Sequence, residues 1–155
     1  MKPFQPCLSS VTTLAALLTL GCAPSTAVGN ESFFSDTVSY IKVISDQGMQ
    51  VAQTMAGVPT SSLEDIRSAL LTAKSVEGAS YADYSRGRDK EGVPSSVRDI
   101  AEDADDAHLQ FQETMSGFLM YWDDKNTAHI TNGSVALKRC ISQANTTVSK
   151  INARR

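Results

Sequence analysis

Apolar residues recur at steps of three, four and seven through most of residues 32–155, and this spacing restricts the fold more than any other feature. Such steps place apolar side chains on one face of an α-helix, whereas a half-buried β-strand alternates apolar and polar residues. No segment keeps up a strand-like alternation, and proline falls between the patterned segments rather than inside them. The spacing therefore predicts an all-α protein.

The patterned region divides into four segments of helical length, separated by short polar connections. The expected helices cover about 32–57, 63–84, 95–122 and 128–152. Short connections favour antiparallel neighbours, and helices of this length supply enough apolar surface for one core. We therefore expect a single domain, an up-down-up-down four-helix bundle over residues 32–155.

Local signals set the expected helix boundaries. Ser61 and Glu64 have the spacing of a capping box at the start of the second helix, and the polar run 85–92 is expected to end it. The pair Asn132-Gly133 is prone to form a turn and makes the start of the fourth helix the least regular. The residues expected to face the core are Phe34, Val38, Ile41, Ile44, Val51, Met55, Leu63, Ile66, Leu70, Ala73, Val76, Ala79, Tyr84, Val97, Ile100, Ala104, His108, Phe111, Met115, Phe118, Trp122, Leu137, Cys140, Ile141, Ala144, Val148 and Ile151.

The N-terminal segment has the anatomy of an export signal. Lys2 precedes an apolar stretch that begins at Val11 and ends at Cys22. Its apolar core of about ten residues suits a secretory signal peptide and is too short to cross a bilayer, which needs about 20 residues.

The last four residues of this stretch, Thr19-Leu20-Gly21-Cys22, resemble the lipobox of small bacterial envelope lipoproteins. The resemblance implies that residues 1–21 are a cleaved signal peptide and that Cys22 carries the lipid, palmitate included. Residues 22–31 would then form a flexible tether, and the bundle would be anchored on the extracytoplasmic face of the cell membrane. Two alternatives stay open: cleavage after Ala27, or an uncleaved segment in which Cys22 is an ordinary apolar residue.

The charge of the chain excludes some partners. Removal of residues 1–21 takes away Lys2 and no acidic residue, so the net charge changes from −3 to −4. An acidic chain gains nothing from counterion release on nucleic acid, and it lacks the polybasic attraction to anionic lipid. We expect no nucleic-acid partner, and a two-chain lipid at Cys22 would have to hold the protein on the membrane.

Few residues are candidates for chemistry, and we predict no catalytic, cofactor-binding or metal site. A haem or metal would need ligands such as His108 with Met49 or Met115, but Met at helical spacing usually fills the core. Cys140 falls at an apolar position and is expected to be a small buried residue. We expect a neutral His108 hydrogen-bonded within the bundle.

Acidic residues gather on one face of the third predicted helix. They are Asp99, Glu102, Asp103, Asp105 and Asp106. Helical carboxylates on one face usually point into water, and the spacing matches no calcium-binding loop. The basic residues Arg86, Arg88 and Lys90 are expected to pair with this face.

Two classes of function fit these features, and neither is an enzyme, because the common catalytic motifs are missing. The first is an interaction or structural module that binds another envelope protein. Its candidate patch is Phe118, Tyr121 and Trp122 near Leu63, although closure of the end of the core is the favoured interpretation of these residues. The second is a carrier of a small ligand, haem or metal around His108, Met115 and Cys140.

Overall fold

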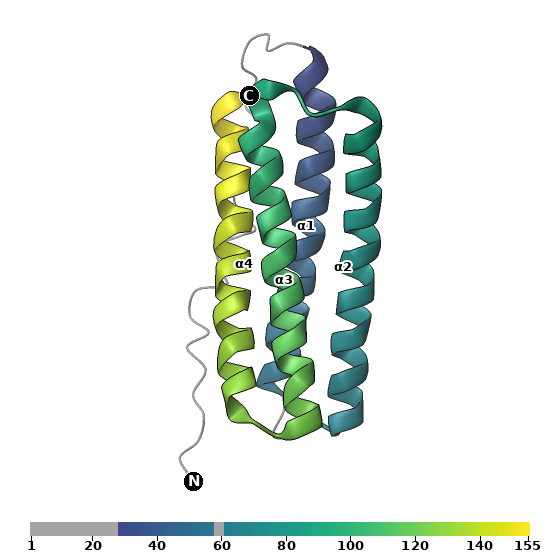
Figure 1. Ribbon diagram of the computed structural model, residues 1–155, viewed down its shortest axis with the longest axis vertical. Helices are drawn as coiled ribbons and strands as arrows, with labels where there is room; N and C mark the ends of the chain where they lie inside the picture. Colours follow the sequence, from purple (N-terminus) through teal and green to yellow (C-terminus); the bar gives the residue numbers. More distant parts are fainter. Residues whose placement is uncertain (1–27, 58–60) are drawn as a thin grey trace.

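The computed structural model describes residues 28–57 and 61–155, which form four long helices. They are α1 (Val28–Ala56), α2 (Leu63–Glu91), α3 (Arg98–Asp124) and α4 (Thr127–Arg154), with a short 3₁₀ helix, η2 (Ser95–Val97), before α3. Figure 1 shows the helices side by side, with α1 and α3 running down and α2 and α4 running up. The predicted all-α four-helix bundle is confirmed.

The first two helices are longer than predicted. Because α1 begins at Val28, residues 28–31 are helical and do not belong to a flexible tether. Cys22 and residues 23–27 lie outside the described part of the chain. The polar run that was expected to end the second helix is itself helical as far as Glu91, so that prediction is wrong.

The second helix continues because most residue types of this run are tolerated in helices and two of its residues, Arg86 and Arg88, form ion pairs. Arg86 forms an ion pair with Asp83 one turn earlier, and Arg88 reaches Asp105 on α3. A single glycine such as Gly87 costs a helix only about 1 kcal/mol relative to alanine. The helix ends instead at Gly92, whose φ of 76° suits glycine and whose N–H donates to the carbonyl of Arg88.

The N-terminus of α2 is capped one residue later than predicted. Ser62 is the N-cap, and its hydroxyl oxygen accepts a hydrogen bond from the N–H of Asp65 at 3.1 Å. The same hydroxyl donates to the Asp65 carboxylate. The cap therefore pairs Ser62 with Asp65, and the predicted pairing of Ser61 with Glu64 is wrong.

The two serines give a direct test of this cap. Ser62→Ala should lower the free energy of unfolding by about 1 kcal/mol, because one N–H at the helix start loses its acceptor. Ser61→Ala changes an exposed side chain outside the cap and should alter the free energy by less than about 0.5 kcal/mol. Urea unfolding of both variants measures the difference. A larger loss for Ser61→Ala would support the capping box predicted from sequence.

Helix α4 is continuous through Asn132-Gly133, where the sequence predicted irregularity. Gly133 is buried against α3, and a Cβ placed on it would lie 2.8 Å from the Phe118 ring. A Cβ on Gly117 of α3 would lie 2.9 Å from the backbone nitrogen of Gly133. Both glycines therefore serve close contact between α3 and α4 rather than a turn.

Many of the buried residues of α3 and α4 are small, and these two helices form the most extensively packed helix pair. The buried small residues of the two helices are Ala101, Ala104, Ala107, Thr114, Gly117, Gly133, Ala136, Cys140, Ala144 and Thr147. The thiol of Cys140 donates to the carbonyl of Ala107 at 3.4 Å. The thiol is thus part of the helix contact, which confirms Cys140 as a small buried residue.

The buried face of α2 differs from the predicted one at the start of the helix, where Leu63 is 50 % exposed, and again after Ala73. Val76 is 43 % exposed and Ala79 is also exposed, whereas Glu77 is fully buried. The buried positions on α2 are Ile66, Leu70, Ala73, Glu77 and Tyr84, which continue the same steps of three, four and seven. The periodicity was correct, but a carboxylate occupies one of its core positions.

Candidate functional site

The side chain of Glu77 lies at the centre of a polar cluster inside the bundle. Its Oε1 accepts a hydrogen bond of 2.6 Å from the hydroxyl of Tyr40 on α1 and lies 2.8 Å from Nδ1 of His108 on α3. Its Oε2 accepts a bond of 2.9 Å from Nε2 of Gln112, one turn further along α3. The carboxylate thus joins three helices.

Burial of a carboxylate is costly unless donors surround it. Here the Tyr40 hydroxyl, the Gln112 amide and the His108 ring replace the water that Glu77 loses on folding. Burial and the hydrogen bond to Glu77 raise the pKa of Tyr40 well above its usual value, so Tyr40 remains a donor. The expectation that His108 is hydrogen-bonded within the bundle is confirmed.

The nearby thiol is unreactive for a related reason. Burial, and then the charge of Glu77, raise the pKa of Cys140 to about 12. A nucleophilic or metal-binding cysteine needs the thiolate form, which this environment disfavours.

Aromatic rings cover the cluster. The ring of Tyr81 stacks on His108 with 3.7 Å between centroids and an angle of 4°, and the ring of Tyr84 stacks on Tyr40 at 4.9 Å. The Tyr81 hydroxyl donates to Asp105, which also accepts a bond from Arg88. The His108 side chain is 17 % exposed, so it marks the edge where the cluster meets solvent.

The residues of the carrier hypothesis do not come together as a ligand set. Met115 and Cys140 are fully buried in the core, and only His108 of the three reaches solvent. Over residues 28–57 and 61–155, no group of three or more His, Cys, Asp or Glu side chains could hold a metal ion. The hydrogen bonds of Glu77 connect α2 to α1 and α3. The Glu77 carboxylate and the His108 imidazole are already hydrogen-bonded to each other.

The predicted acidic face of α3 divides into paired and unpaired residues. Asp99 binds Arg154 and Lys150 of α4, and Asp103 binds Lys150 and Gln143. These α4 partners were missed because the sequence does not show which helix lies beside the acidic residues. In contrast, Glu102 and Asp106 are exposed.

The predicted pairing with the basic run is correct in part. Arg88 binds Asp105 at 2.6 Å, as expected, and Arg88 also lies over the ring of Tyr84. Arg86 instead pairs with Asp83 of its own helix, and the side chain of Lys90 lies outside the described residues.

The ion pair at Asp99 makes the stability of the bundle depend on pH. The hydrogen bonds from Arg154, with added attraction from Lys150, lower the pKa of Asp99 from 3.8 to about 2. A lowered pKa in the folded state stabilises the fold at pH values above 3.8, and this contribution is lost as the pH falls towards 2.

Asp99→Asn should therefore flatten the fall in melting temperature between pH 4 and pH 2, compared with the unchanged protein. Arg154→Gln removes the main partner and should flatten the same part of the curve. Thermal unfolding followed by circular dichroism across this range measures the effect. Parallel curves for all three proteins would show that the pair does not stabilise the fold.

The aromatic residues at the end of α3 close the core. Phe118 is 1 % exposed and Trp122 is 9 % exposed, and the indole N–H of Trp122 donates to the carbonyl of Leu63 at 3.0 Å. Tyr121 is half-buried beside Lys125. Of the two interpretations of this end, core closure is the one observed, so these residues do not form an exposed docking patch.

Most of the ion pairs lie at one end of the bundle, whereas the larger exposed apolar side chains lie near its middle or towards the other end. The larger exposed apolar residues lie near the middle or towards the end opposite the start of α1: Met49, Leu63, Leu71, Val76, Leu109, Met120 and Val135. Figure 1 places the start of α1 at the same end as the C-terminus of the chain. Most of the ion pairs gather there: Arg86–Asp83, Arg88–Asp105, Lys150–Asp99, Lys150–Asp103, Arg154–Asp99 and Arg155–Glu31.

Comparison with known proteins assigns the chain to no family. No protein-family model matches the chain, and no curated protein or solved structure matches it either. Among the described residues, no helix has the length and apolar content needed to cross a membrane.

Proposed function

We propose that this protein is a lipid-anchored module of the cell envelope, held by Cys22 on the extracytoplasmic face of the membrane, that binds another envelope protein without catalysing a reaction. The observation that carries the proposal is the position of Cys22. It ends an apolar segment of export-signal length, in a sequence resembling a lipobox, just before α1 begins at Val28.

The short distance between Cys22 and Val28 orients the proposed module. Six residue steps span at most roughly 20 Å, and helices of this length are about 40 Å long. The end that contains most of the ion pairs would therefore lie near the membrane. The opposite end, which exposes most of the apolar side chains, would point away from the bilayer towards a partner.

The interior of the bundle supports a binding rather than a catalytic role. Glu77 and His108 are bonded to each other, and the thiol of Cys140 is buried with a raised pKa. These are the groups that would supply a base, a nucleophile or a soft metal ligand, and each is already used in packing or hydrogen bonding. In this proposal the exposed apolar side chains supply the contacts for a partner.

Metabolic labelling with an alkyne analogue of palmitate tests the anchor. We expect the full chain to incorporate the label in a bacterial host and Cys22→Ser to lose it. Cys7→Ser, in the proposed signal peptide, is the matched control and should keep the label. Equal labelling of Cys22→Ser and the unchanged protein would contradict the proposal.

A further inference from the structure

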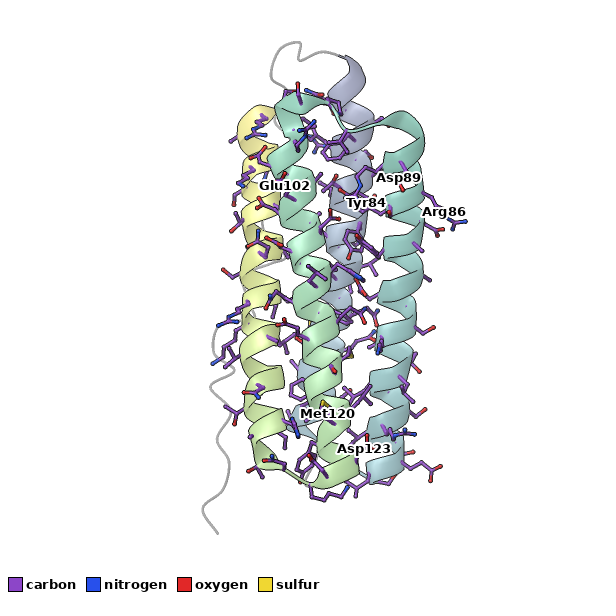
Figure 2. The ribbon with its side chains drawn as sticks, in the orientation of Figure 1. Tyr84, Arg86, Asp89, Glu102, Met120 and Asp123 are labelled. Carbon is purple, nitrogen blue, oxygen red and sulfur yellow. The ribbon has the colours of Figure 1, made fainter. Side chains whose placement is uncertain are left out.

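One line of residues along α3 faces away from the other helices and combines acidic and apolar side chains. At steps of four, three, four, seven and three, it contains Glu102, Asp106, Leu109, Glu113, Met120 and Asp123, all exposed. We call this line the outer α3 face. Leu109 is 56 % exposed, the highest value among the larger apolar residues described, and Met120 is 47 % exposed. Figure 2 shows Glu102, Met120 and Asp123 along the length of this helix.

The acidic residues of the outer α3 face differ from their neighbours on the same helix. Asp99, Asp103 and Asp105 each bind a basic residue of α2 or α4. None of the four acidic residues of the outer face forms an ion pair within residues 28–57 and 61–155. Basic side chains thus balance the charge of the acidic residues at the helix contacts. The acidic residues of the outer α3 face have no such basic partner among the described residues.

We propose that the outer α3 face docks a basic amphipathic helix of the partner protein. This rests on the binding role proposed above, but it does not depend on the lipid at Cys22. Leu109 and Met120 lie about 16 Å apart along the helix, a distance that a partner helix of three or more turns would span. Its apolar residues would cover these two side chains, and its Lys and Arg residues would face the four carboxylates.

Charge complementarity favours this partner over others. Four uncompensated carboxylates on one face repel an acidic surface and attract a basic one, which selects the partner and speeds its association. The two apolar residues at helical spacing correspond to the anchors by which one amphipathic helix recognises another surface. A second copy of this acidic chain would place like charges opposite each other if it docked through the same face.

A peptide-binding measurement tests the proposal. The probe is a fluorescent synthetic amphipathic helix of Lys and Leu, and its matched control is the same helix with Glu in place of Lys. We expect the full chain to bind the Lys/Leu helix, less tightly as salt rises, and not to bind the Glu/Leu helix. Fluorescence anisotropy measures the affinity, and circular dichroism checks that each variant keeps its helices.

Paired variants separate this face from the general negative charge. Asp106→Lys combined with Glu113→Lys should weaken binding about tenfold or more, as should Leu109→Ser combined with Met120→Ser. Asp46→Lys combined with Glu64→Lys makes the same charge change on exposed residues of α1 and α2 and should have less than about a threefold effect.

Three outcomes would overturn the proposal. One is an equal loss of affinity in the control pair, Asp46→Lys with Glu64→Lys, which would mean that overall charge alone attracts the peptide. Another is binding that survives loss of both apolar side chains. The third is a dimer of the chain that dissociates on Leu109→Ser, which would show a second copy on this face. Labelling at Cys22 is independent of these three outcomes. Peptide binding and labelling therefore test the docking face and the lipid anchor separately.

Discussion

Glu77→Ala is expected to lower the free energy of unfolding by about 3–5 kcal/mol, the largest loss we predict for a single substitution. The substitution leaves the donors of Tyr40, His108 and Gln112 in the interior without their acceptor, and it removes the volume of a fully buried side chain. Since domains of this size are stable by only about 5–15 kcal/mol, the variant should unfold at a much lower urea concentration.

The neighbouring residue provides the matched control. Val76→Ala removes an apolar side chain that the periodicity assigned to the core, but which is 43 % exposed. It should change the free energy by less than about 0.5 kcal/mol. Glu77→Gln keeps one acceptor oxygen and should fall between the two. If Val76→Ala proves the more damaging of the two alanine variants, the side chain of Val76, and not that of Glu77, faces the core.

Gly117→Ala should destabilise the bundle by up to about 2 kcal/mol, although alanine is normally the better helix residue. The new Cβ would lie 2.9–3.0 Å from backbone atoms of Gly133 and His129 on α4. Because these are backbone atoms, α3 and α4 would have to separate, at a cost of about 1–3 kcal/mol. The gain in helix propensity, about 1 kcal/mol, offsets only part of that cost.

Gly78→Ala on α2 is the matched control for this substitution. A Cβ at Gly78 meets no atom within 4 Å, so only the gain in helix propensity remains. This variant should be more stable than the unchanged protein by about 0.5–1 kcal/mol. Urea unfolding of the two variants should therefore give shifts of opposite sign, and two stabilising substitutions would exclude close contact of α3 with α4 at Gly117.

The helices could be predicted from the sequence because each one repeats apolar residues over many turns. Phe34, Ile44, Ile100, Phe111 and Ile151 all lie where the spacing placed them. Errors of one residue in a single cap, such as Ser62 for Ser61, do not disturb a pattern that extends over 25 residues or more. The number and order of the helices therefore follow from the spacing alone.

The polar cluster could not be predicted in the same way. Apolar periodicity places Val76 in the core, because a carboxylate such as that of Glu77 counts as a surface residue in the pattern. Burial of Glu77 depends on donors from α1 and α3, and the sequence does not show that Tyr40 and His108 lie beside it. One signal was present: Glu77 continues the steps from Leu70 and Ala73 to Tyr84.

The role of Gly133 was predicted wrongly for a similar reason. An Asn-Gly pair is a frequent turn, but here the absent side chain allows close contact with α3 at Gly117. Whether a glycine forms a turn or allows close helix contact depends on the helix that packs against it. Helix contacts of this kind, like the ion pairs of Lys150 and Arg154, become visible only when the helices are placed together.

The most direct test of the proposed anchor is the mass of the mature N-terminus. The protein should be purified from membranes of a bacterial host, digested, and its N-terminal peptide measured by mass spectrometry. We expect a peptide that begins at Cys22 and carries a diacylglycerol-type lipid. A mature chain that begins at Val28, or one that retains residues 1–21 with an unmodified Cys22, would contradict the lipid anchor.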